Sequence, residues 1–600
     1  MKRIFLCILM LMNGVFLGAE NHGVGCYVSE SVIPFHQLTP CGPIPSVYDP
    51  DGVYPYMSYS ETSKRPFPQK YRTVVLENEY IVATICPDLC GKVMSLIHKP
   101  SGKETLYVPG VIKGTRILPR FYFTAGGIEV SFPISHSPTQ NDPVQYSIIQ
   151  NPDRTYVCCG ERERHFGLQW LVEYSLGPDD DFLTERVVYY NPGRCTYPWM
   201  SWSNAAIPCN PDTHYCFPNG EVLSHASELK TIDWEKEGTK YERDIKEMTG
   251  YFWQTSDVNA FGAFTPSLGV GLFHVADEKS APGIKLWSYG VEADREWSML
   301  STPVKQPYVE LQGGPARDQS IKLELKGGEK RSHVEFWIPT DRELDIRSLK
   351  VPDVQLRGID EIELFGWTDS PDISFWTGFA KAYECRLPVP QAPSPMDCLW
   401  APSGMEDLSD AFLWATATSE GKQRDNYMYY YGVWLAGRER IQEAIAVLSD
   451  CTDDLAKAVK ARLLFREGDI DSAVQTYRSV PENSYLNLIP QFICERDLVL
   501  SRKGKETITE REAYFNHVSA SDDEWICERM VHLLMDKGQY AEAEQLLMSI
   551  DFQKVHQTYT RTDAWKQIRA KLKKNNRTVP ESLGEDRLAR FGAYREYEEQ

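Results

Sequence analysis

Beyond its N-terminus, the 600-residue sequence lacks any apolar run long enough to cross a bilayer. At the N-terminus, Lys2 and Arg3 precede the apolar stretch IFLCILMLMNGVFLGA. This stretch has the length of a signal-peptide core and falls short of the ~20 clean apolar residues of a membrane span. Gly18 and Ala19 offer a cleavage site. The sequence therefore predicts a signal peptide at 1–19 and an exported chain, periplasmic or extracellular, with no membrane span.

Positive charge is also scarce. The chain has 64 Lys and Arg against 84 Asp and Glu, a net charge of −20, and loss of Lys2 and Arg3 with the signal brings it to −22 (−20 − 2). Such a surface repels phosphate backbones, and no basic stripe is interleaved with aromatic residues. These absences exclude nucleic acid as the expected partner.

Cysteine is too sparse for a disulfide scaffold, with 15 residues in 600. The spacings to note are Cys86 with Cys90, Cys209 with Cys216, and the adjacent Cys158 and Cys159. None of them makes the paired CxxC pattern of a structural zinc site. The sequence therefore predicts neither a metal site nor a cofactor.

Short β-branched and aromatic runs fill the sequence from about residue 70 to 340, for example YRTVVLEN, QWLVEYSL and HVEFWIP. Many short strands at close spacing are typical of a β-sandwich or barrel. A segment of about 270 residues is longer than a simple immunoglobulin-type sandwich needs. We therefore expect a larger assembly of two sheets.

The pattern changes after the proline-rich stretch LPVPQAPSPMD, which indicates a linker or a domain edge because proline lacks the backbone N–H. Beyond it, AGRERIQEAIAVL, EGDIDSAVQTY and KGQYAEAEQLLM align on Gly437, Gly468 and Gly538, and Gly504 divides the longer interval. A period near ~34 with glycine at the turn is typical of tetratricopeptide repeats. Such repeats either pack against the β region or form a groove for a protein partner.

Four blocks occur in order in the β region: GGIEVSFPISHSPT, WMSWSNAAIP, VGLFHVADEKSAPGIKLWSYG and PYVELQGGPARDQS. With the opening LENEYIVATICPDLCGKVMSLIHKP, they resemble the galactose mutarotase-like, or aldose epimerase-like, superfamily. Within it they resemble the branch catalogued as domain of unknown function 5107, whose members often carry tetratricopeptide repeats. The resemblance implies a multidomain β + α protein: a galactose mutarotase-like β-supersandwich with a sugar cleft across its concave sheet, then an α-helical tetratricopeptide-like domain.

The expected organisation has five parts along the chain. They are the signal peptide at 1–19, an N-terminal lead segment at 20–65, the β-supersandwich at 66–345, a connecting segment at 346–395 and the helical repeats at 396–600.

The resemblance also implies site residues. In the mutarotases a glutamate takes the proton of the anomeric hydroxyl while a histidine protonates the ring oxygen. YVELQGG resembles the strand of that base, which gives Glu310 this role and puts Gln312 on the same strand face. GGIEVSFP resembles a glycine-led strand lining the cleft, and it carries Glu129.

One block departs from the mutarotase pattern. WMSWSNAAIP occupies the place of the strand that supplies the acid histidine, yet it offers Trp202 and Asn204 and no histidine. His136 or His274 would have to enter from another strand. Glu129 instead adds a second carboxylate, and two carboxylates flanking one bond are what glycoside hydrolysis requires. Glu129 is therefore the candidate acid.

Lys285 and Trp287 share one face of the strand GIKLWSYG. The tryptophan can stack on a pyranose ring while the lysine binds a hydroxyl or a carboxylate. Structural alternatives stay open for several candidates: Glu129 as a loop ligand, His136 as a turn cap and His274 as a core histidine.

The sequence thus favours an exported glycoside hydrolase-type enzyme that acts on an extracellular glycan. One alternative is an aldose 1-epimerase-like enzyme with a relocated acid. The other is a non-catalytic glycan-binding module whose helical repeats dock a protein partner.

Overall fold

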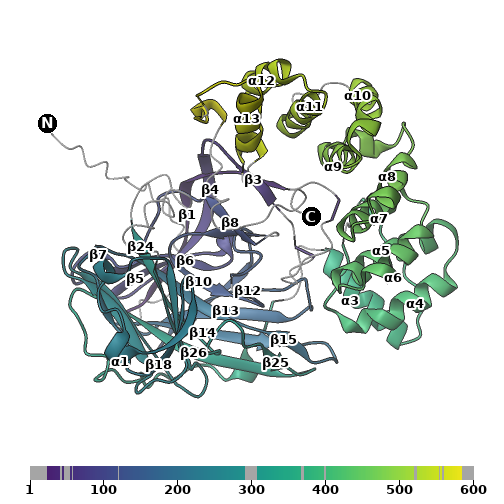
Figure 1. Cartoon of the computed structure of the whole chain (residues 1–600). Helices are drawn as coiled ribbons and strands as arrows, with labels where there is room; N and C mark the ends of the chain where they lie inside the picture. Colours follow the sequence, from purple (N-terminus) through teal and green to yellow (C-terminus); the bar gives the residue numbers. More distant parts are fainter. Residues whose placement is uncertain are drawn as a thin grey trace.

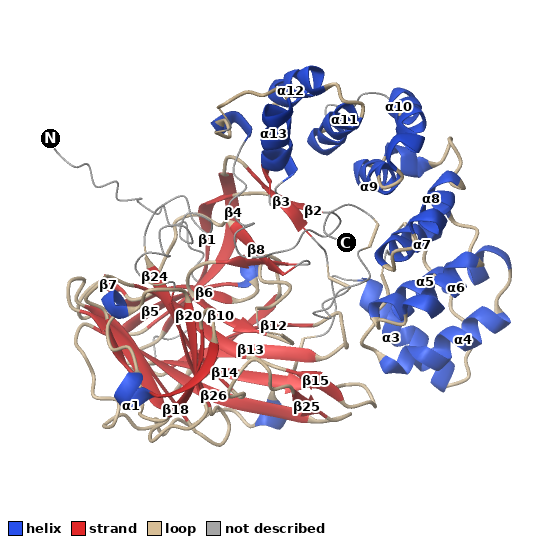
Figure 2. Cartoon of the chain, in the orientation of Figure 1, coloured by secondary structure: helices blue, strands red, loops and turns tan. Residues whose placement is uncertain are grey.

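The computed structural model describes most of the chain after the predicted signal peptide, which lies outside the described residues (Figure 1). The described residues are 23–40, 44–45, 55–56, 59–118, 121–134, 136–288, 290, 307–365, 371–396, 400–518, 523–552, 554–556, 560–576 and 578–583. Over these ranges a β domain precedes a helical domain (Figure 2). Within them, no helix combines the length and the apolar character that a bilayer crossing requires.

The larger sheet has 12 strands in the order β1-β4-β5-β6-β10-β16-β24-β23-β20-β18-β19, with β7 beside β6. Neighbouring strands in this sheet pair antiparallel. The bounds are β1 (Gly25–Phe35), β4 (Phe67–Glu77), β5 (Ile81–Cys86), β6 (Lys92–His98), β7 (Lys103–Glu104), β10 (Ile128–Ser131), β16 (Trp202–Pro208), β18 (Glu221–His225), β19 (Leu229–Asp233), β20 (Thr249–Trp253), β23 (Gly283–Ser288) and β24 (Tyr308–Gly314).

The second sheet has 8 strands in the order β11-β12-β13-β14-β26-β22-β21-β17. Its bounds are β11 (Gln145–Gln150), β12 (Thr155–Arg162), β13 (Gln169–Leu176), β14 (Leu183–Tyr190), β17 (His214–Cys216), β21 (Ala260–Thr265), β22 (Val270–Ala276) and β26 (Lys330–Thr340). Three small sheets complete the described strands: β15 (Tyr197–Trp199) with β25 (Leu323–Leu325), β8 (Gly114–Leu118) with β9 (Phe121–Thr124), and β2 (Leu38–Pro40) with β3 (Tyr59–Ser63) and β27 (Lys554–His556).

One large apolar core lies between the two main sheets. Strand alternation sends every second side chain of each sheet into it. On β16, for example, Ala205 and Ile207 belong to this core, as do Val172 and Val187 of the second sheet. The expected two-sheet, mutarotase-like sandwich is confirmed, and each strand of the larger sheet keeps a second face that points away from the core.

The N-terminal lead segment is not a separate part. Strand β1 pairs with β4 along all 11 residues, from Gly25 opposite Glu77 to Phe35 opposite Phe67. Residues 25–35 are therefore an edge strand of the larger sheet. The expected domain start at residue 66 was too late because the proline-rich stretch 40–55 separates β1 from β4 in the sequence.

The helical domain consists of antiparallel helix pairs that follow one another in an arc (Figure 1). Gly468 and Gly538 adopt left-handed φ angles of 81° and 76° between paired helices, as expected for repeat turns. The tetratricopeptide-like architecture is confirmed. The described helices after α1 (Trp234–Glu237) are α3 (Pro371–Glu384), α4 (Ser409–Thr418), α5 (Gly421–Gly437), α6 (Ile441–Ser449), α7 (Asp454–Arg466), α8 (Ile470–Arg478), α9 (Pro490–Ser501), α10 (Ile508–His517), α11 (Glu524–Asp536), α12 (Tyr540–Ser549) and α13 (Thr560–Lys571).

Helix α3 lies inside the segment that was expected to be a connector. Its Trp376 and Phe379 are fully buried, with ring centroids 5.6 and 5.4 Å from that of Phe412 on α4. The helical unit therefore includes α3 and begins well before residue 396. The prolines at 388–395 follow this first helix and separate it from α4.

The N-terminal part of the chain also reaches into the helical domain. Ile44 is 1% exposed within the helical core. The side-chain amide of Gln491 bonds both its N–H (3.0 Å) and its carbonyl (3.1 Å). Nη1 of Arg462 donates to the carbonyls of Ile44 (3.1 Å) and Pro45 (2.5 Å). The helical repeats thus hold Ile44 and Pro45 of their own chain.

Arg462→Ala is expected to release this segment and to destabilise the helical domain by roughly 3 kcal/mol, because it leaves the buried Glu495, 2.5 Å from Nη2 of Arg462, without its charge partner. Hydrogen exchange around residue 44 and urea denaturation measure the two effects. Arg424→Ala, at an exposed position of α5, is the matched control. Unchanged protection of Ile44 in the Arg462 variant would contradict this account.

Candidate functional site

Four polar residues lie side by side on adjacent strands of the larger sheet, in the order Glu129, Asn204, Gln312 and Lys285. We call these four residues the polar row. Their chain neighbours, such as Ile128 and Leu311, point into the core between the sheets. Because successive side chains of a strand point to opposite faces, the polar row lies on the face that points away from the core.

A second row runs beside it on the same face. Glu310 pairs with Trp287 across β24 and β23, and each lies two residues from a member of the polar row. The ring of Trp287 is partly exposed, whereas Trp202, two residues before Asn204 on β16, is fully buried. The structure therefore brings Glu129, Trp202, Asn204, Lys285, Trp287, Glu310 and Gln312 to one sheet face.

Glu129 is held as a carboxylate. Its Oε2 lies 3.2 Å from Nδ1 of His136, and its Oε1 accepts a 3.1 Å hydrogen bond from the backbone N–H of Ser137. Burial alone would raise the pKa of Glu129, but His136, the nearby ammonium of Lys92 and the Ser137 amide together lower it below the usual value. His136 adopts a left-handed φ of 62° at this turn, which costs energy in a non-glycine residue. This turn directs the imidazole toward Glu129.

The environment of Glu310 shifts its pKa in the opposite direction. Its carboxyl is buried and accepts a 2.8 Å hydrogen bond from Nε2 of Gln312. Burial raises the pKa of Glu310, the charge of Glu129 adds to the rise, and His136 and Lys285 only partly oppose it. Glu310 thus keeps its proton to a higher pH than Glu129 does. This favours the reverse of the expected roles, which made Glu310 the base and Glu129 the acid.

The ammonium of Lys285 is buried without a hydrogen-bond partner among the described residues. Its Nζ lies 4.9 Å from the ring centroid of Phe252 and 5.8 Å from that of Trp202. Burial lowers the pKa of Lys285 to about 8, opposed by the charge of Glu310. A buried ammonium held only by aromatic rings can donate three hydrogen bonds to a ligand.

Several buried polar atoms on this face have no hydrogen-bond partner among the described residues. They are both amide atoms of Asn204, Oε1 of Gln312 and Nε1 of Trp202. Buried polar groups in proteins are almost always hydrogen-bonded. The donors and acceptors gathered here are therefore suited to a ligand rich in hydroxyl groups.

Lys92 belongs to the site and was not predicted from the sequence. It lies on β6, is 4% exposed, and donates from Nζ to the carbonyl of Thr124 at 2.7 Å. No pattern in the sequence marks it as a buried lysine. Gly127, with φ of 72°, allows this approach, since a Cβ there would lie 2.3 Å from the carbonyl oxygen of Val93 and 3.1 Å from Cγ of Lys92. The signal available in the sequence was the glycine pair before Glu129.

His274 does not lie on this face. It belongs to β22 of the second sheet, is 1% exposed, and its Nε2 lies 3.1 Å from Oε1 of Glu335. The expectation that His274 contributes to the sugar site is therefore not supported by its position. The alternative of a core histidine describes it correctly, because β22 is covered on both faces.

His274 is part of a buried charge network behind the site strands. Oε2 of Glu335 accepts a 2.5 Å hydrogen bond from the hydroxyl of Ser203 and lies 3.4 Å from Nε2 of His333. The hydroxyl of Ser203 also contacts Oε1 of Glu185. A hydroxyl has one proton, so one of the two carboxyl groups has to be protonated and donate to Ser203, and the pKa shifts favour Glu185. Consistently, burial and the charge of Glu335 raise the pKa of Glu185 to about 8, while His274 and His333 hold that of Glu335 well below its usual range despite burial.

Comparisons with known proteins identify the same two-part organisation, a β domain followed by a helical domain. Residues 48–340 match the family model "Domain of unknown function (DUF5107)", and residues 376–568 match a second model described as a C-terminal domain. The expected resemblance is confirmed: a mutarotase-like sandwich of this family is followed by tetratricopeptide-like helices.

One solved structure is similar along nearly the whole chain. It is a TPR-domain containing protein from Parabacteroides distasonis ATCC 8503, with 63% identity over 96% of this chain and 100% of its own, and a TM-score of 0.79. The chain belongs to the family of that protein. Two others match the β part: a putative mutarotase from Salmonella typhimurium (10% identity, 47% and 94% of the two chains, TM-score 0.37) and a galactose mutarotase-like protein from Clostridium acetobutylicum (13%, 45% and 95%, TM-score 0.34).

Proposed function

We propose that the β domain is a carbohydrate-active enzyme that cleaves a glycosidic bond, with Glu310 as the general acid and Glu129 as the base or nucleophile. The observation that supports this is a pair of carboxyl groups on one sheet face whose environments move their pKa values in opposite directions. Such a divergence is how two carboxyl groups acquire acid and base roles. Glycoside hydrolysis uses this combination on the two sides of one bond.

The remaining groups of the face fit a sugar. The side-chain amide atoms of Asn204 and Gln312 that have no partner among the described residues can bond ring hydroxyl groups, which both donate and accept hydrogen bonds. Trp287 offers a partly exposed ring on which a pyranose can stack. With the expected signal peptide, we propose an extracellular glycan as the substrate and the periplasm or the cell exterior as the location.

An aldose 1-epimerase is the second candidate, and the position of His136 supports it. Its imidazole contacts Glu129 and influences the carboxyl of Glu310, so the acid missing from β16 has a substitute on the turn after β10. The two enzymes differ in their products: a glycosidase releases a new reducing end, whereas an epimerase interconverts anomers of a free sugar.

Incubation of the purified chain with a panel of glycans and free aldoses, with analysis of products and anomers, tests the proposal. New reducing ends from one glycan class, lost in Glu310→Gln, are expected. Saturable binding by calorimetry without any product would instead indicate a glycan-binding module.

Lys285→Met is expected to weaken ligand binding about tenfold with little effect on folding, because it keeps the apolar stem and removes the ammonium. Since the pKa of Lys285 is lowered to about 8, the ammonium is present below that pH and lost above it. Wild-type affinity should therefore fall as pH rises through about 8, and the variant should lose this dependence. Calorimetric titration between pH 6 and 9 measures both; a variant with an unchanged pH profile would contradict a direct contact.

A protein partner for the helical repeats remains a proposal. Gln491 and Arg462 already hold Ile44 and Pro45, so a partner peptide at the same place would have to displace the chain's own segment.

A further inference from the structure

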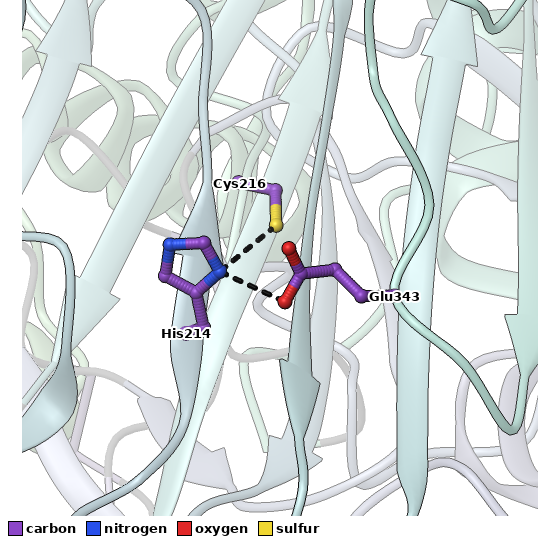
Figure 3. Close-up of side chains that lie close together, drawn as sticks. All are labelled: His214, Cys216 and Glu343. Atoms are coloured by element: carbon purple, nitrogen blue, oxygen red, sulfur yellow. Dashed lines mark hydrogen bonds and ion pairs between the residues drawn. The ribbon is translucent and has the colours of Figure 1, made fainter.

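Three side chains far from the polar row converge at the edge of the second sheet. Nδ1 of His214 lies 2.9 Å from Oε2 of Glu343 and 3.6 Å from Sγ of Cys216, and the three atoms all lie within 4.8 Å of one another (Figure 3). Each of them is a common ligand atom for a transition metal.

The fold explains how they meet. His214 and Cys216 are two residues apart on β17, so they share a face, while Tyr215 between them is 1% exposed and points into the core. Glu343 follows β26, at the start of a segment that crosses the outer face of the second sheet. The side chains of Leu344 and Ile346 pack on that face in one apolar cluster with Cys216.

Hydrogen bonding makes full use of only one of the two contacts of Nδ1 at a time. A given tautomer of His214 has either a proton or a lone pair on Nδ1. With the proton, Nδ1 donates to Glu343 and cannot accept from the thiol; with the lone pair, it accepts from the thiol and faces the carboxylate lone pairs. Both contacts are satisfied together when the nitrogen, the sulfur and the oxygen surround one cation.

We propose that His214, Cys216 and Glu343 bind a zinc ion. Zinc bonds of ~2.0–2.1 Å to nitrogen or oxygen and ~2.3 Å to sulfur, at tetrahedral angles, separate the ligand atoms by roughly 3.3–3.6 Å. The 3.6 Å distance from Nδ1 of His214 to Sγ of Cys216 matches this value. The 2.9 Å distance from Nδ1 of His214 to Oε2 of Glu343 would have to increase slightly. A neutral imidazole, a thiolate and a carboxylate balance a divalent charge once the thiol proton leaves to solvent.

The surroundings leave one coordination position of the ion to water. The ring of Tyr241 stacks on His214 at 4.8 Å between centroids, which fixes the imidazole plane. The side chain of Glu343 is 47% exposed, so water reaches the remaining coordination position. The ion would attach the crossing segment to β17, an edge strand of only three residues. The sequence contained no local signal for it, because a His-x-Cys pair completed by a glutamate 127 residues after Cys216 (343 − 216) has no recognised spacing.

The test uses the full chain without a polyhistidine tag, stripped with a chelator and kept reduced. We expect one equivalent of zinc by metal analysis and calorimetry, a higher melting temperature with zinc, and a thiolate-to-metal charge-transfer band with cobalt(II) alone. Cys216→Ser and His214→Gln should each weaken zinc binding at least ~10-fold and remove the charge-transfer band.

Cys385→Ser, which removes an exposed cysteine, is the matched control and should bind zinc like the wild type. Metal-free melting temperatures of the two site variants should equal that of the metal-free wild type, which separates lost ligation from misfolding. A stripped wild type that takes up no stoichiometric zinc, or wild-type affinity in either site variant, would overturn the proposal.

Discussion

Glu310→Gln is expected to lower turnover of a verified glycan at least ~100-fold, the scale of a lost general acid. Glutamine keeps the size of the side chain, and its amide can still contact Gln312, but it has no proton to give to the leaving group. Because burial raises the pKa of Glu310, wild-type activity should persist above the ordinary range of a carboxylic acid and fall on the alkaline side as Glu310 loses its proton. Steady-state kinetics as a function of pH measures both effects.

Glu129→Gln should lower turnover by a comparable factor. It should act on the acidic limb of the pH–activity profile. The pKa of Glu129 is lowered, so wild-type activity should fall on the acidic side as this carboxylate gains a proton. Glu221→Gln, at an exposed position of β18 in the same sheet, is the control. Turnover within a few-fold of the wild type in both site variants would rule out the proposed chemistry.

The second large effect concerns stability. Glu335→Gln is expected to cost roughly 3 kcal/mol, because it removes the buried negative charge beside His274 and His333. Glu185→Gln should cost about 1 kcal/mol or less, since an amide replaces a carboxyl that already has its proton and can donate to Ser203 in the same way. Urea denaturation followed by tryptophan fluorescence measures the difference.

The pH dependence of the free energy of unfolding also distinguishes Glu185 from Glu335. The folded-state pKa of Glu185 is raised to about 8 from an ordinary 4.5, so its contribution to stability is complete below about 4.5 and lost as pH rises through about 8. As pH rises from 5 to 8, the cost of Glu185→Gln relative to the wild type should therefore fall and turn into a gain. For Glu335, whose pKa is lowered, the contribution is present above 4.5 and lost in acid. Equal costs for both variants at all pH values would contradict the assigned protonation states.

The sequence predicted the sandwich, the order of the two domains and the face shared by Glu310 and Gln312, because period-two alternation and repeat glycines are local signals. It did not reveal Lys92 or the amide of Ser137, which reach Glu129 only through sheet pairing and a turn. His274 was ambiguous because VGLFHVAD is buried on both faces, so its alternation does not distinguish the interior from the site. The opposite pKa shifts of Glu129 and Glu310 depend on burial and neighbouring charges, which no strand pattern encodes.

The small sheet β2-β3-β27 has a consequence for the order of folding. Lys554 pairs with Ser63, a separation of 491 residues (554 − 63), and Ile44 is enclosed by helices α7 and α9. Closing contacts of such long range carries a high entropic cost and delays folding. A chain that emerges residue by residue can complete the sandwich first, but its early segment has no helical partner until most of the repeats exist. The junction between the two domains is therefore expected to form last. A chain truncated before residue 554 lacks β27 and should leave β3 open to proteolysis, whereas Ile44 keeps Arg462 and Gln491.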